Sequence, residues 1–169
     1  ILAVDGDDIL CSTAAMRRVA DALEAGHDYA ASQGLPLGMN AFGYGVPFLR
    51  QALAGRENEI LETGWGRIFD GSRLHAIDMA PPTPEKTALR FTLDYPEDLA
   101  FFQAVSRELG DALVAADDAT VIRIVRERGL AALNVHLQQE YMRNFTQGRD
   151  EEIALALAAT GRDVVPPQG

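Results

Sequence analysis

The chain opens with Ile1-Leu2-Ala3-Val4-Asp5-Gly6-Asp7-Asp8, a short apolar run followed directly by three carboxylates. The apolar run predicts a strand, and a helix follows because Met16, Val19 and Leu23 recur at helical spacing until Gly26 ends the pattern. The acidic residues therefore lie at the carboxyl end of a predicted strand. In open α/β sheets this is the edge at which ligands bind.

A second acidic segment, Thr92-Leu93-Asp94-Tyr95-Pro96-Glu97-Asp98-Leu99, follows the alternating residues of a strand predicted over 87–93. A helix is predicted from Pro96, with Leu99, Phe102, Val105 and Leu109 on one apolar stripe. Two strand ends thus carry carboxylates. We expect Asp7 and Asp94 to lie close together at one edge of the sheet.

The remaining pattern alternates between strands and helices and predicts an α/β fold. Strands are predicted over 27–32, 42–46 and 74–79, the last as a neighbour of 87–93, and helices over 48–54, 119–128 and 130–145. Residues 1–145 are expected to form one domain. Residues 146–169 are expected to form a helical or frayed tail.

Composition excludes several classes of function. The chain has 169 residues, 47% of them hydrophobic, and a net charge of −10, which disfavours nucleic acid as a partner because phosphate backbones need a basic face. The single Cys11 excludes an internal disulfide, and no apolar run approaches the roughly 20 residues that cross a membrane. A cytoplasmic protein without a membrane partner is the default prediction.

Three segments together resemble a known family. Val4-Asp5-Gly6-Asp7-Asp8, Leu35-Pro36-Leu37-Gly38 leading into Ala41-Phe42-Gly43, and above all Arg90 to Leu99 are similar to the cytidylyltransferases of the spore coat polysaccharide biosynthesis group, related to the Kdo and acylneuraminate cytidylyltransferases. The resemblance covers Ile1 to about Phe145. It implies a glycosyltransferase-A-like (Rossmann-like) mixed sheet with flanking helices and a helical C-terminal segment.

The resemblance also implies an activity and a cofactor. The expected reaction is transfer of a cytidylyl group from CTP to a sugar acid or a modified sugar, with Mg²⁺ held by Asp7 and Asp94 as catalytic metal ligands. Expected sugar contacts are Gly38 and Asn40 in the loop before residue 41, together with Trp65 and Arg67. Trp65 is equally suited to a dimer interface.

Members of that family begin with a glycine-rich loop carrying Arg and Lys that holds the triphosphate, and nothing in this chain corresponds to it. Ile1 also falls inside a strand pattern. We therefore expect an amino-terminal truncation and no turnover of CTP by the chain alone. The alternative is a trimmed chain whose first strand is complete.

Two alternatives stay open at this point. Acidic residues after strands and in first helical turns are favoured by turn chemistry and the helix dipole alone, which would make Asp7 and Asp94 structural. The chain would then be a non-catalytic interaction or dimerisation domain. Asp8 and Asp98 are expected to be capping and solvated groups even if the resemblance holds. A homodimer is expected in either case, because the helices after Leu109 carry many apolar residues: Val121, Ile122, Val125, Leu130, Leu133, Leu137 and Tyr141.

Overall fold

The structure is a computed structural model that describes residues 1–57, 59–79 and 89–160. Within these residues, one mixed sheet holds β1 (Leu2–Ala3), β2 (Tyr29–Gln33), β3 (Phe42–Tyr44) and β4 (Leu74–Asp78), in the order β1-β3-β2-β4. β3 is antiparallel to β1 and β2, whereas β2 and β4 are parallel. The predicted α/β class is confirmed, and the strands predicted over 27–32, 42–46 and 74–79 form with small shifts at their ends.

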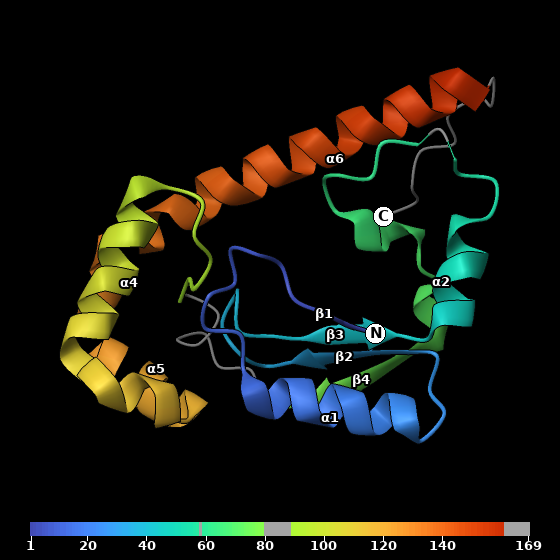
Figure 1. Ribbon diagram of the computed structural model, residues 1–169. Coiled ribbons are helices and arrows are strands. Elements are labelled where there is room, and N and C mark those ends of the chain that lie inside the picture. The colour runs from blue at the N-terminus through green and yellow to red at the C-terminus, as the bar shows by residue number, and fades with distance from the viewer. Residues whose placement is uncertain (58, 80–88, 161–169) are drawn as a thin grey trace.

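Helix α1 (Thr13–Glu24) lies along one face of the sheet (Figure 1). Ser12 caps it, because its Oγ accepts a hydrogen bond from the N–H of Ala15 at 3.0 Å. The apolar side of α1 packs on the small residues of the sheet, in a buried cluster of Ala15, Val19, Ala22, Ala30, Ala41 and Ile77. This packing fixes the start of α1, and with it one end of the acidic segment that connects β1 to α1.

An aromatic cluster supports the other end of the sheet. Helix α2 (Val46–Leu53) has Pro47 in its first turn, and a short 3₁₀ turn, Trp65–Ile68, follows later in the chain. Their rings pack with those of β2 and β3 at centroid distances of 5.0 to 5.7 Å: Tyr29, Tyr44, Phe48, Trp65 and Phe69. Trp65 is thereby fixed beside the sheet.

The strand predicted over 87–93 does not form among its described residues, 89–93. Arg90 makes an isolated parallel bridge with Leu37, and the N–H of Phe91 donates to the carbonyl of Leu37 at 2.9 Å. β4 pairs with β2 instead of with this segment. Gly38 allows the backbone of its loop to approach the backbone of Phe91 closely, because a Cβ on Gly38 would lie 2.3 Å from the Phe91 carbonyl oxygen.

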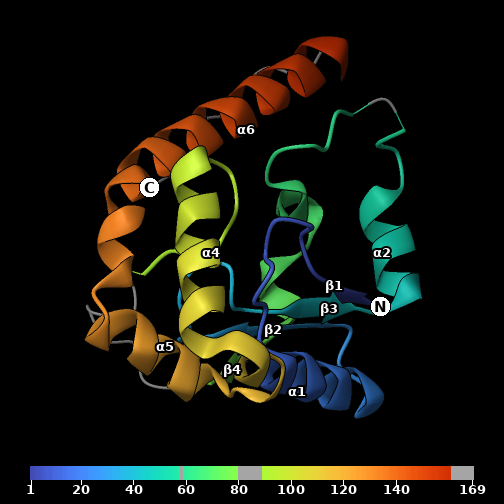
Figure 2. The same cartoon turned by 60° about the vertical axis from the view of Figure 1, so that its left-hand side comes forward.

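A helical layer lies beside the sheet (Figure 2) and contains α4 (Pro96–Leu109) and α5 (Asp118–Glu127). Phe102 and Val105 are buried as predicted, but Leu99 is 49% exposed. Phe101 takes its place in the core, where its ring meets Phe91 edge to face at 5.1 Å. The predicted stripe is therefore correct for Phe102, Val105 and Leu109, which packs against the same core, and wrong for Leu99.

The apolar residues behind the dimer prediction pack mostly inside their own chain. Val121, Ile122 and Val125 lie in the core cluster of α4 and α5, and Leu137 is 7% exposed. Leu130 and Tyr141 are half-buried, and Leu133 is 39% exposed. Because most of these apolar side chains are covered by their own chain, they no longer argue for a homodimer, which stays a prediction.

After α5, residues 130–137 form 3₁₀ turns rather than the continuous helix predicted over 130–145. Helix α6 (Gln138–Thr160) then runs from the helical layer to the loop between α2 and β4 (Figures 1 and 2). The predicted domain boundary at residue 145 falls inside α6. Residues 161–169 of the predicted tail, and 87–88 of the predicted strand, lie outside the described residues. None of the described helices has the length and apolar character to cross a membrane.

Candidate functional site

Asp7 and Asp94 meet at a single hydroxyl group. Thr92 Oγ1 lies 3.0 Å from Asp7 Oδ2 and 3.0 Å from Asp94 Oδ2, so twice that distance, about 6 Å, is the greatest possible separation of the two carboxylate oxygens. The backbone ties the same segments together, because the N–H of Leu93 donates to the carbonyl of Asp7 at 3.0 Å. The structure brings the two acids together as expected. Their role as metal ligands stays a prediction.

The shared hydroxyl cannot satisfy both carboxylates at once. Thr92 has one hydroxyl proton, so it donates to only one of them at a time. The other carboxylate then faces an oxygen lone pair. Since Thr92 is 2% exposed, little water reaches this hydroxyl to compensate. A cation bound by both carboxylates would relieve this crowding of oxygen atoms.

Asp98 organises the loop that presents Asp94. Its carboxylate accepts hydrogen bonds from the backbone N–H groups of Asp94 and Tyr95, each at 3.0 Å, and so caps α4. It also receives Nε of Arg90 at 2.9 Å and Nδ2 of Asn134 at 2.9 Å. Asp98 is therefore a cap, as turn chemistry predicts, but it is buried among partners rather than solvated.

Arg90 connects Asp98 to Asp94. Its guanidinium is fully buried, donates to both carboxylates and lies 4.4 Å from the ring centre of Tyr141 and 5.4 Å from that of Tyr95. Burial raises the pKa of Asp98, but the hydrogen bonds from Arg90, the Asp94 backbone and Asn134 outweigh it, and the pKa lies below its ordinary value. Asp94 is thus held by a rigid, ionised support.

The neighbouring carboxylates repel one another. Burial, followed by the charges of Asp7, Asp5 and Asp94, raises the pKa of Asp8 to about 7. Burial and the charge of Asp7 also raise the pKa of Asp5. The segment after β1 is therefore a region of concentrated negative potential, which favours a cation.

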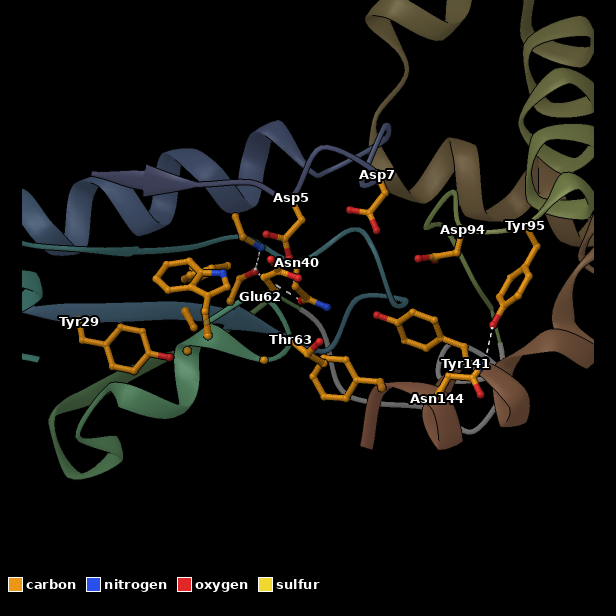
Figure 3. Close-up of a pocket in the computed structure, with 18 residues that line it drawn as sticks. Asp5, Asp7, Tyr29, Asn40, Glu62, Thr63, Asp94, Tyr95, Tyr141 and Asn144 are labelled. Carbon is orange, nitrogen blue, oxygen red and sulfur yellow. Dashed lines mark hydrogen bonds between the residues drawn. The ribbon is translucent and has the colours of Figure 1, made fainter. Parts of the chain in front are cut away.

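Asp5, Asp7 and Asp94 line a cavity of about 720 Å³ (Figure 3). The carboxylates of Asp5, Asp7 and Asp94 point into it, and the hydroxyl of Tyr141 points toward them from the other side. The rest of the lining is mostly aromatic or polar and includes Tyr29, Ser32, Asn40, Thr63, Trp65 and Asn144. A cavity of this size and mixed lining is suited to a small polar ligand with a flat or ring-shaped part.

The structure brings two of the four predicted sugar contacts to this cavity. Asn40 lines it, with its Nδ2 fixed by the carbonyl of Leu35 at 3.0 Å, and Trp65 also lines it. Gly38 does not, because it packs on the backbone of Phe91. Arg67 does not either, because its guanidinium binds the carbonyls of Thr63 and Ile60, both at 2.7 Å.

Sequence analysis missed the contribution of α6. Tyr141, Asn144 and Phe145 line the cavity, and Asn144 Nδ2 lies 3.1 Å from the hydroxyl oxygen of Tyr95. Burial, followed by the charges of Asp94 and Asp7, raises the pKa of Tyr141, so its hydroxyl keeps its proton and can donate. The spacing of Tyr141 and Phe145, one helical turn apart, is the only signal in the sequence for this wall.

Comparison of the chain with models of known protein families, with curated proteins and with solved structures gives no match. Within residues 1–57, 59–79 and 89–160, no group of three or more His, Cys, Asp or Glu side chains is arranged as a metal cage. Two carboxylates plus ligand oxygens remain a sufficient donor set for Mg²⁺, which rarely uses an all-protein cage.

Proposed function

We propose that this chain carries a magnesium-dependent nucleotidyltransferase site that transfers a cytidylyl group from CTP to a sugar. The observation that carries the proposal is the pairing of Asp7 and Asp94 at the Thr92 hydroxyl, on the rim of a cavity large enough for a sugar. The sequence resemblance supplies the reaction and the nucleotide. The arrangement of an acidic segment after β1, a mixed sheet and flanking helices supports a glycosyltransferase-A-like fold.

The donor set fits the metal that this chemistry uses. Both carboxylates are hard oxygen ligands, and Arg90 orients Asp94 by an ion pair to Asp94 Oδ2. When bound, Mg²⁺ would neutralise charge on the α-phosphate during displacement of pyrophosphate. Asp7 and Asp94 are the residues that would hold it.

The remaining residues orient the acceptor. Trp65 offers an aromatic face for a sugar ring, and Asn40 and Tyr141 offer polar groups for its hydroxyls. In the reaction, a sugar oxygen forms a bond to the α-phosphorus, the bond from that phosphorus to the bridging oxygen breaks, and pyrophosphate leaves. The proton of the sugar hydroxyl passes to solvent or to a nearby carboxylate. Catalysis is then mainly positioning and electrostatic stabilisation.

A second candidate is a non-catalytic interaction domain of the same fold. One observation favours it: the described lining of the cavity includes no lysine or arginine, and the guanidinium groups of Arg67 and Arg90 are bound within the chain. A triphosphate needs donors as well as a metal ion. Such a domain would bind neither Mg²⁺ nor CTP at this cavity.

Calorimetric titration of the chain with Mg²⁺ tests the proposal, because it needs no turnover of CTP by the chain alone. We expect Asp7→Asn and Asp94→Asn to weaken Mg²⁺ binding at least about tenfold, since each removes a metal ligand. Asp111→Asn, which alters an exposed acid of the helical layer, should leave the affinity unchanged. Equal affinity in all three variants would contradict the proposal. A wild-type chain that does not bind Mg²⁺ would identify the interaction domain.

A further inference from the structure

Helix α6 meets a loop far away in the sequence, and this contact closes one side of the cavity. The N–H of Thr63 donates to Glu152 Oε1 at 2.7 Å, and Arg67 Nη2 lies 3.1 Å from Glu152 Oε2. Glu152 is 8% exposed, although it lies on a helix that is otherwise largely solvated. A buried carboxylate that binds both a backbone N–H and an arginine stabilises the contact between two segments more than an exposed surface ion pair does.

Two glycines let the helix and the loop touch directly. A Cβ on Gly64 would lie 3.1 Å from Phe145 Cζ, and one on Gly148 would lie 3.3 Å from Thr63 Oγ1. Gly64 also has a φ of 59°, a conformation that side chains rarely adopt. A Cβ at either position would force its neighbour to shift by a few tenths of an ångström, and a long side chain would require a larger movement.

The fastened segments are the ones that wall the cavity. Thr63, Gly64 and Trp65 line it from the loop, and Tyr141, Asn144 and Phe145 line it from α6. Figure 3 shows Thr63, Tyr141 and Asn144 on the side of the cavity away from Asp5 and Asp7. Moving the part of α6 that follows Tyr141 away from the loop would therefore widen the cavity on the side away from Asp5 and Asp7.

The start of α6 is anchored by the adjacent turn Val135–Leu137, whose Leu137 is buried. The far half has neighbours besides Thr63 and Arg67, because Ile153, Ala156 and Leu157 border a second hollow together with Arg56 and Glu59. Toward its far end, Ile153 and Leu155 are 36% and 59% exposed. The helix is thus anchored at one end and fastened by Glu152 toward the other.

We propose that Glu152 is a positioning residue that latches α6 over the cavity, and that the ligand enters and leaves when this latch opens. The inference rests on the proposed function for the identity of the ligand and on the geometry alone for the latch. Burial raises the pKa of Glu152, but hydrogen bonds from Thr63 and the charge of Arg67 outweigh it, so the carboxylate stays ionised at neutral pH.

Hydrogen exchange of the ligand-free protein tests the latch without any assumption about function. In Glu152→Gln we expect the amides of residues 60–67 and 141–149 to exchange at least about tenfold faster than in wild type, because a charge-assisted hydrogen bond is lost. Amides of α1 should not change. Glu151→Gln is the matched control, since Glu151 is exposed and bonds only Gln147 in the described structure. Faster exchange confined to Thr63, or equal exchange in both variants, would overturn the proposal.

A second variant opens the latch while leaving Glu152 intact. Gly148→Leu keeps helix propensity high but places a side chain against Thr63, so it should reproduce the exchange pattern of Glu152→Gln. Wild-type exchange of residues 60–67 and 141–149 in this variant would overturn the latch.

Trp65 is the only tryptophan of the chain, so its fluorescence reports the cavity. Stopped-flow mixing with N-acetylneuraminate, an acidic sugar of the proposed acceptor class, should show association and dissociation at least about threefold faster in Glu152→Gln than in Glu151→Gln, because entry no longer waits for opening. Equal rates would overturn the latch. Absence of any sugar signal in the wild type would count against the proposed function, while the exchange experiment still decides the latch.

Discussion

Arg90 and Asp98 form a completely buried ion pair, with Arg90 Nε 2.9 Å from Asp98 Oδ1 and Arg90 Nη2 3.0 Å from Asp98 Oδ2. The same Arg90 Nη2 also binds Asp94. The pair therefore supports the candidate metal ligand directly. A buried pair of this kind is costly to break, because the partner left behind keeps an uncompensated charge.

Replacing one partner of this pair should destabilise the fold. We expect Asp98→Asn to lower the free energy of unfolding by about 3–5 kcal/mol, since it leaves the Arg90 charge buried beside Asp94 alone. Urea unfolding followed by circular dichroism measures this. Asp111→Asn should change stability by less than about 0.5 kcal/mol. A loss of similar size in both variants would show that Asp98 is an ordinary surface cap.

Acid should weaken the fold through the same residue. The pKa of Asp98 lies below its ordinary value of 3.8, so the folded chain takes up this proton less readily than the unfolded chain. Its stabilisation is therefore complete above the unfolded pKa and is lost as pH falls through the lower folded pKa. Unfolding free energies measured from about pH 6 to about pH 2.5 should fall less steeply in Asp98→Asn than in wild type. Parallel profiles would contradict this origin.

Cys11 should be an unreactive thiol. Burial, followed by the charges of Asp8, Asp118 and Asp5, raises its pKa from 9.0 to about 11. At about pH 8, the thiolate fraction should fall about 100-fold on folding, and reaction with a disulfide reagent should slow accordingly. Comparing native protein with protein unfolded in guanidinium measures this ratio. If the thiol reacted at nearly the same rate in the native and the unfolded protein, Cys11 would be more exposed, or farther from acidic residues, than the structure shows.

Tyr141 should separate stability from ligand binding. Tyr141→Phe keeps the ring over Arg90, so we expect a stability change below about 0.5 kcal/mol, whereas Tyr141→Leu should cost about 1–2 kcal/mol by removing the cation–π contact. Urea unfolding compares the two. Both variants should weaken sugar binding, because both lose the hydroxyl that points into the cavity. Equal stability of the two variants would mean that the ring contact contributes nothing.

Apolar periodicity and turn residues predicted the elements of the fold that depend on neighbours in the sequence. The strand, acidic segment and helix around Asp7 follow from an apolar run and turn residues. Asp7 does lie beside Asp94, but through the Thr92 hydroxyl and the Leu93–Asp7 backbone hydrogen bond rather than through two neighbouring strand ends. The strand over 87–93 was wrong because the approach of Gly38 to Phe91 depends on a tertiary contact. Leu89 and Phe91 pack in the core of the helical layer, while the intervening Arg90 and Thr92 are buried as well, in the network around Asp98 and Asp94.

The far wall of the cavity could not be predicted for a similar reason. Tyr141 and Asn144 reach it only because α6 crosses from the helical layer to the loop, a path that no local periodicity encodes. Arg67 is diverted from the cavity by Glu152, a partner that lies on α6 and that sequence spacing does not connect to it. Long-range ion pairs of this kind decide which charged residues remain free to bind a ligand.

Binding of Mn²⁺ to the chain in the absence of nucleotide tests the central claim most directly, because free Mn²⁺ is counted by its paramagnetic resonance signal and no turnover is needed. We expect one ion to bind per chain, with affinity weakened at least about tenfold in Asp7→Asn and in Asp94→Asn, and unchanged in Asp111→Asn. Binding that is the same in all four proteins, or that is absent in wild type, would contradict a metal site at Asp7 and Asp94.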